Sequence, residues 1–89
     1  MLKAELMLYD AWSLKDKRSV IQGVTQRLRD RFNVSVAEIG HRDAPQRCTL
    51  GIAVVSSDTR SAHARLDKMV ELLRSHRQLS LIEYERAFV

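Results

Sequence analysis

The 89-residue chain has little of several residue types on which many small domains depend. It contains a single cysteine, Cys48, so no disulfide can form within the chain. Its three glycines, Gly23, Gly40 and Gly51, stand far apart, which excludes a glycine-rich loop for ATP or a dinucleotide. No apolar run exceeds four residues, as in Ile52 to Val55, which is far short of a membrane span. We therefore expect packing or oligomerisation alone to hold the fold together.

The chain also lacks the residue constellations of common enzymes. His41, His63, His76 and Cys48 have none of the short spacings of a zinc site. Asp58 is better placed to cap a helix than to support a serine nucleophile. We therefore expect no enzymatic activity, no metal, no cofactor and no small-molecule substrate.

The overall composition is that of one folded domain. Apolar residues make up 45% of the chain and charged residues 29%, which is typical of globular proteins. Lys3 and Glu5 interrupt any signal-peptide core at the start of the sequence. We expect one soluble, cytoplasmic domain over residues 1–89 with no membrane contact.

Hydrophobic periodicity predicts six elements in the order βαββαβ. Strands are predicted over residues 1–9, 34–39, 48–55 and 79–89, and helices over 13–31 and 58–76. Two strand-helix-strand units joined by a hairpin give a ferredoxin-like α+β sandwich. We therefore predict a four-stranded antiparallel sheet in the order 4-1-3-2, with both helices on one face.

Local signals refine this prediction. Ser13 and Asp16 form an approximate capping box at the start of the first helix. The alternation of the second strand slips between Val36 and Ala37, which predicts a bulge in an edge strand. In the last strand, one face is expected to carry three apolar or aromatic residues and the other two acids, namely Ile82, Tyr84 and Phe88 opposite Glu83 and Glu85.

Positive charge is concentrated on the first predicted helix. Residues 13–31 contain six basic side chains and two acids, so this segment carries the whole formal charge of +4. On a helical projection, one acid-free stripe runs for about 21 Å at about 1.5 Å per residue. The stripe consists of Lys15, Arg18, Gln22, Gln26 and Arg29.

Two interpretations of this charge remain open. In the first, the helix contacts the phosphates of RNA or of a ribosomal subunit. The residues expected to do so are Lys15, Lys17, Arg18, Arg29 and Arg31. Arg42 and Arg47, which flank the loop between the second and third predicted strands, are secondary candidates. In the second, the basic face is merely solvated and the chain is a protein-interaction module.

The predicted sheet face away from the helices bears on the second interpretation. The third strand has no aromatic residue, which disfavours the base stacking of RNA-recognition motifs. The outward positions are small or apolar instead, namely Met7, Tyr9, Ala53 and Val55. Such a surface and its unpaired edge strands favour a homo-oligomer.

Two segments, Ser13 to Val20 and Arg29 to Glu38, resemble the YlxP-like family of small bacterial proteins. The similarity continues through Gln46-Arg47, Leu50-Gly51, Val54 to Ser56 and Glu83 to Glu85. The resemblance implies a ferredoxin-like fold and, from the genes that usually lie beside this family, a link to RNA or ribosome maturation. It implies no catalytic residues.

The chain also departs from the family pattern. Ala44 and Pro45 stand where bulkier residues are more common, and Gln22 and Thr25 stand where lysine is frequent. These differences make a binding contact through the loop less favourable and reduce the number of basic residues in the stripe.

Overall fold

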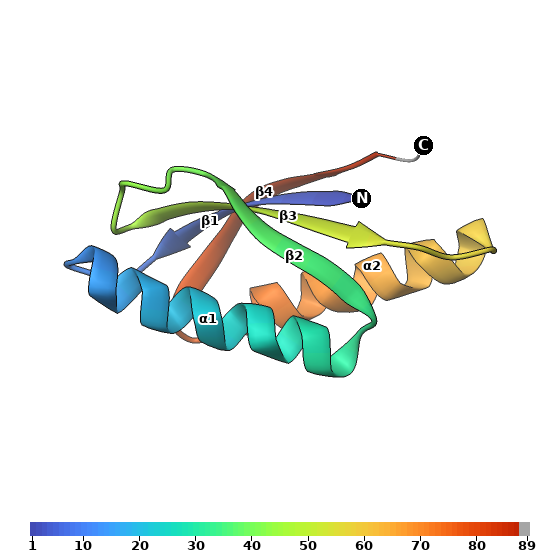
Figure 1. Cartoon of the computed structure of the whole chain (residues 1–89), viewed down its shortest axis with the longest axis horizontal. Helices are drawn as coiled ribbons and strands as arrows, with labels where there is room; N and C mark the ends of the chain where they lie inside the picture. The colour runs from blue at the N-terminus through green and yellow to red at the C-terminus, as the bar shows by residue number, and fades with distance from the viewer. Residues whose placement is uncertain (88–89) are drawn as a thin grey trace.

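The computed structural model describes residues 1–87 and has the predicted order of elements (Figure 1). The strands are β1 (Leu2–Leu8), β2 (Val34–Gly40), β3 (Arg47–Val54) and β4 (Leu79–Arg86). The helices are α1 (Leu14–Arg31) and α2 (Thr59–Arg74), and both lie on the same side of the sheet (Figure 1). The predicted ferredoxin-like α+β architecture is therefore confirmed.

The sheet is antiparallel throughout, in the order β2-β3-β1-β4, which is the predicted order. In such a sheet, the β1–α1 connection and the β2–β3 loop come together at one end, as Figure 1 shows. Two backbone hydrogen bonds hold this end together. Leu8 N–H donates to Gln46 O at 2.9 Å, and Tyr9 N–H donates to Gln78 O at 3.1 Å.

The bulge in β2 lies further along the strand than the sequence pattern predicts. Val36 pairs regularly with Ile52, whereas the register shifts between Glu38 and Gly40. The apparent slip after Val36 arises because the charged Glu38 occupies an inward position, opposite the buried Leu50. The predicted bulge position is therefore wrong, although β2 is an edge strand as expected.

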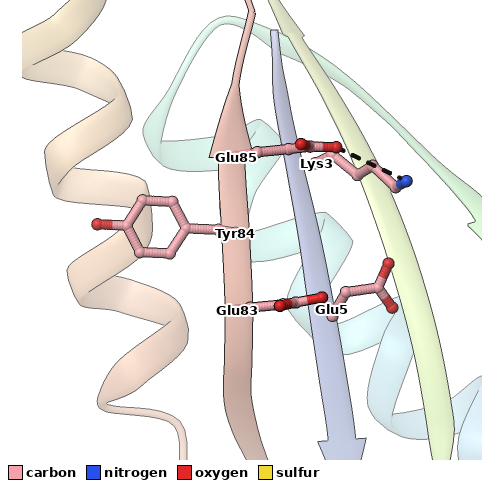
Figure 2. A pocket seen from close by; sticks show the side chains of 5 residues that line it. All are labelled: Lys3, Glu5, Glu83, Tyr84 and Glu85. Atoms are coloured by element: carbon pink, nitrogen blue, oxygen red, sulfur yellow. Dashed lines mark ion pairs between the residues drawn. The ribbon is translucent and has the colours of Figure 1, made fainter.

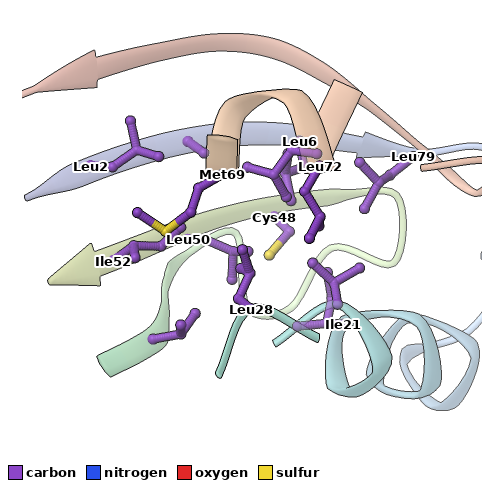
Figure 3. Close-up of a cluster of buried hydrophobic side chains, with 14 of the residues drawn as sticks. Leu2, Leu6, Ile21, Leu28, Cys48, Leu50, Ile52, Met69, Leu72 and Leu79 are labelled. Atoms are coloured by element: carbon purple, nitrogen blue, oxygen red, sulfur yellow. The ribbon is translucent and has the colours of Figure 1, made fainter. Parts of the chain in front are cut away.

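The core fills the space between the sheet and the two helices (Figure 3). The inward residues of β1 and β3 meet apolar side chains from both helices, because strands alternate with period two and helices with period 3.6. Fully buried members include Leu6, Leu28, Ile52, Leu66 and Leu73. The predicted core is confirmed at these positions, and the predicted Val54 is partly buried against the same cluster.

The last strand presents different chemistry on its two faces. Glu83 pairs with Glu5 and Glu85 with Lys3 on the side away from the helices. Tyr84 points the other way, toward α2 (Figure 2). The predicted separation of Tyr84 from the two acids is confirmed, whereas Phe88 lies outside the described residues.

Within residues 1–87, neither helix is long and apolar enough to cross a membrane.

Candidate nucleic-acid interface

The start of α1 is fixed by its cap. Ser13 adopts extended backbone geometry, and its hydroxyl accepts a hydrogen bond from Asp16 N–H at 3.1 Å. The Asp16 carboxylate in turn accepts from Trp12 N–H at 3.1 Å, one residue before the cap. The predicted pairing of Ser13 with Asp16 is confirmed. In the helix that follows, Ile21, Val24 and Leu28 are buried in the core.

One flank of α1, beside its buried face, carries the predicted basic stripe. All five of its residues are exposed: Lys15, Arg18, Gln22, Gln26 and Arg29. Lys15 and Arg18 have no ion-pair or hydrogen-bond partner among residues 1–87. Arg29 donates one hydrogen bond to the backbone oxygen of Val36 at 3.1 Å, so the stripe lies on the flank of α1 beside β2. Gln26 is less available, since its amide donates to Asp30 at 2.8 Å.

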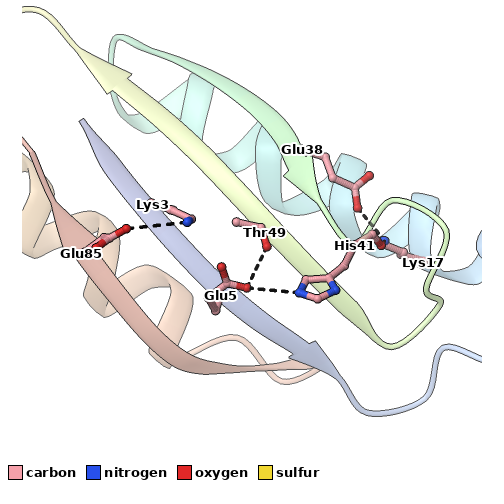
Figure 4. Close-up of polar contacts among 7 residues, drawn as sticks. All are labelled: Lys3, Glu5, Lys17, Glu38, His41, Thr49 and Glu85. Atoms are coloured by element: carbon pink, nitrogen blue, oxygen red, sulfur yellow. Dashed lines mark hydrogen bonds and ion pairs between the residues drawn. The ribbon is translucent and has the colours of Figure 1, made fainter.

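Lys17 does not belong to this surface, although the sequence pattern predicts a phosphate contact for it. Its side chain is only 2% exposed, and its ammonium lies 2.6 Å from Glu38 Oε2 (Figure 4). The same ammonium donates to the backbone oxygen of His41 at 2.5 Å. A lysine held in this way cannot reach a phosphate in solvent, so the prediction for Lys17 is wrong.

The contacts of Lys17 shape the loop that follows β2. Among the described non-glycine residues, His41 alone has a left-handed backbone conformation, with φ of 58°. The bond from Lys17 to its carbonyl holds this unusual conformation and directs the chain into the β2–β3 loop. The buried lysine therefore positions Arg42, the next residue, relative to α1.

Arg42 and Arg18 line one hollow of about 300 Å³ at the start of α1. Arg42 has no ion-pair partner among residues 1–87. Asp43 lines the same hollow and offsets part of the positive charge. The secondary candidate Arg42 thus joins the α1 stripe, which sequence alone could not determine.

Arg31 and Arg47 lie elsewhere. Arg31 lines a groove on the other flank of α1, together with Phe32 and the α2 residues Asp67, Lys68 and Glu71. Arg47 begins β3 and lines a separate hollow with Trp12. The structure therefore divides the predicted set into a basic face, comprising Lys15, Arg18, Arg29 and Arg42, and residues outside it.

Two titrating groups reflect their surroundings. Burial raises the pKa of the Cys48 thiol to about 12, and the neighbouring Glu38 carboxylate adds to this effect. Partial burial lowers the pKa of His76, and the positive charge of Arg27 contributes further. Neither group lines the basic face.

The uncovered face of the sheet has a different character. Lys3, Glu5, Glu83 and Glu85 point to this side around a hollow of about 140 Å³ (Figure 2). Lys3 pairs with Glu85 at 3.7 Å, and Glu5 accepts a hydrogen bond from Thr49 at 2.7 Å (Figure 4). Among residues 1–87, no group of three or more His, Cys, Asp or Glu side chains is arranged to hold a metal ion.

One exposed aromatic residue was not among the predicted site residues. Trp12 lies in the β1–α1 connection and is 77% exposed. The sequence pattern indicates only a short turn in this segment. The position of a tryptophan directly before a helix cap is the sequence feature that could have marked it as a candidate site residue.

Taken together, the fold and surface define a small ferredoxin-like α+β domain with one basic helix face. The chain belongs to the DUF503 family, described as a protein family of unknown function, whose family model matches residues 1–86. It is similar to the uncharacterized protein YlxP of Bacillus subtilis (strain 168), with 40% identity over 73 residues. That match covers 82% of this chain and 79% of the relative.

Proposed function

We propose that this protein binds the phosphate backbone of RNA through the basic face, acting in the cytoplasm without catalysis. The observation that carries the proposal is the pair Lys15 and Arg18, which are exposed and have no partner among the described residues. Unpaired cations in a row release counterions when they meet a polyanion. The polyanion that we propose as the partner is RNA on or near the ribosome.

The extent of the face supports the same proposal. Lys15 and Arg29 lie at its two ends, about 21 Å apart at about 1.5 Å of rise per residue. Arg42 widens the face beside Arg18, since both line one hollow. Neither acid of α1 belongs to the stripe: Asp16 accepts from Trp12 N–H, and Asp30 accepts from Gln26. The Asp30 carboxylate therefore lies against Gln26 in the later part of the stripe, and a phosphate backbone would approach mainly through Lys15 and Arg18.

The proposal is tested by reversing two charges on the face. We expect Lys15→Glu with Arg18→Glu to weaken binding of an oligouridine RNA by roughly 25-fold or more at 0.1 M salt, because each lost phosphate contact costs about fivefold there. The matched control is Arg60→Glu with Lys68→Glu, which makes the same charge change on α2. Both pairs are exposed and form no side-chain ion pair among residues 1–87, so both variants should fold. Equal losses in the two variants would overturn the proposal.

A second candidate function is self-association through the uncovered face of the sheet. The observation that favours it is a hollow of about 240 Å³ where small residues leave room beside Ile39, which is 49% exposed. Ala37, Gly51 and Ala53 line this hollow. Of the outward residues noted from the sequence, Met7 is 40% exposed and Val55 is 90% exposed. A second copy of the chain would cover such a surface.

Light scattering tests the second candidate. The expected result is a dimer at micromolar concentration, which Ala53→Arg converts to a monomer because a charged side chain would enter the contact. A wild-type protein that is already monomeric would remove this candidate and leave the RNA proposal untouched.

A further inference from the structure

Trp12 has an unusual combination of a fixed backbone and a free side chain. Its N–H donates to Asp16, and the preceding Ala11 is buried in the core. Trp12 is nevertheless 77% exposed. A large aromatic ring on a backbone held by these contacts is available to stack on a flat ligand group.

The surroundings of Trp12 combine apolar surface with positive charge. A shallow hollow of about 370 Å³ lies between the β1–α1 connection and the β2–β3 loop. Its lining residues are Ala11, Trp12, Ala44, Pro45, Gln46 and Arg47. Arg47 is exposed and has no ion-pair partner among residues 1–87. Figure 1 shows that both contributing segments lie at the end of the molecule where α1 begins.

The basic face begins directly beside this hollow. Lys15 follows Trp12 by three residues, and Arg18 shares the neighbouring hollow with Arg42. Three carboxylates, those of Asp10, Asp16 and Asp43, are also exposed at this end, so its charge is mixed. A ligand that suits both parts must combine a flat apolar group with regularly spaced negative charges.

We propose that Trp12 is a stacking platform for an unpaired base, so that the protein binds single-stranded rather than fully paired RNA. Arg47 would hold the phosphate on one side of the stacked base, and Lys15, Arg18 and Arg42 the phosphates on the other. Stacking tolerates any sequence because every base has a flat face, whereas a base within a duplex is already stacked on its neighbours. This inference rests on the function proposed above and specifies its substrate class.

The experiment uses the intrinsic fluorescence of the protein, because Trp12 is its single tryptophan. The full chain is titrated with an oligouridine, with an abasic oligonucleotide of the same length and with an RNA duplex of the same length. We expect the oligouridine to quench the indole emission. The abasic strand and the duplex should bind through their phosphates, in a salt-dependent manner, with little quenching. Equal quenching by all three would overturn the stacking platform.

Substitution of the ring provides the second measurement. Trp12→Ala should weaken oligouridine binding by roughly 5- to 150-fold, the range that corresponds to about 1 to 3 kcal/mol per stacked base. It should leave duplex binding nearly unchanged, and Trp12→Phe should recover most of the lost affinity. A loss that is the same for oligouridine and duplex would contradict stacking, and so would no loss at all.

These outcomes separate the two proposals. If Trp12→Ala is neutral while Lys15→Glu with Arg18→Glu abolishes binding, the basic face stands and the platform fails. If none of the three nucleic acids binds, both proposals fail. If the indole emission instead depends on protein concentration without RNA, a second copy occupies the hollow and the platform is overturned.

Discussion

The ammonium of Lys17 and the carboxylate of Glu38 form an ion pair of 2.6 Å between α1 and the edge strand β2. The lysine is buried and the glutamate is 24% exposed, so the pair is poorly screened by water. Since Lys17 also holds the His41 carbonyl, this pair links the basic helix to the loop that carries Arg42. The pair therefore has a structural role, whereas the exposed cations around it are the ones we propose to bind RNA.

Breaking this pair should destabilise the fold. We expect Lys17→Met to lower the free energy of unfolding by about 3 kcal/mol, because it leaves the Glu38 charge without its partner and the His41 carbonyl without its donor. Chemical denaturation measures the loss. Lys15→Met is the matched control, and its effect should be near zero because Lys15 is exposed.

The double variant Lys17→Met with Glu38→Gln should be more stable than Lys17→Met alone, because it removes the unpaired charge. If the two variants have equal stability, Glu38 is already well solvated and the ion pair does not support the loop.

The Cys48 thiol should resist modification in the folded protein. Its pKa is raised to about 12 by burial and by Glu38, so hardly any thiolate forms at pH 8. We expect alkylation to be rapid in denaturant and very slow in its absence. Rapid alkylation of the native protein would show that Cys48 is open to solvent.

The raised pKa also gives stability a pH dependence. The unfolded chain loses the thiol proton near pH 9.0, the ordinary pKa of a cysteine, and the folded chain loses it only near pH 12. The contribution of the neutral thiol is therefore fully present below pH 9.0 and is lost as the pH rises toward 12. Cys48→Ala should flatten this part of the stability profile, which denaturation at a series of pH values measures.

Two glycines should respond to alanine in opposite directions. At Gly23 in α1, an added Cβ would meet nothing within 4 Å, so Gly23→Ala should raise the free energy of unfolding by about 1 kcal/mol. At Gly40, an added Cβ would lie 2.8 Å from Thr49 Oγ1, so Gly40→Ala should lower the melting temperature. Thermal denaturation distinguishes them. A melting temperature that rises in both variants would contradict the close packing of β2 on β3 at the bulge.

Much of the fold could be predicted because its signals are local. The alternation of Leu2 to Leu8 fixes the face of β1, and the caps Ser13 and Asp58 fix where both helices begin. The bulge in β2 could not be located, because the inward Glu38 disguises the alternation. The ion-pair partner of Glu38 is Lys17 of α1, and the residue pattern of a strand does not show which residue of another element it contacts.

The candidate site was predicted less completely. Lys17 precedes Ile21 by four residues and Val24 by seven, so a helical projection already places it on the buried side of α1. The number of cations in the segment does not distinguish the buried Lys17 from the exposed cations. The grouping of Arg42 with Arg18, and of Arg47 with Trp12, depends on the path of the β2–β3 loop and required the structure.

The salt dependence of RNA binding tests the central claim most directly. With five phosphate contacts from Lys15, Arg18, Arg29, Arg42 and Arg47, the logarithm of oligouridine affinity should fall against the logarithm of salt concentration with a slope of roughly −3.5. Replacing Lys15, Arg18 and Arg42 together by glutamine should reduce that slope to roughly −1.4, since each contact contributes about −0.7. An unchanged slope in the folded triple variant, or no salt-dependent binding by the wild-type protein, would contradict the basic face as the RNA contact.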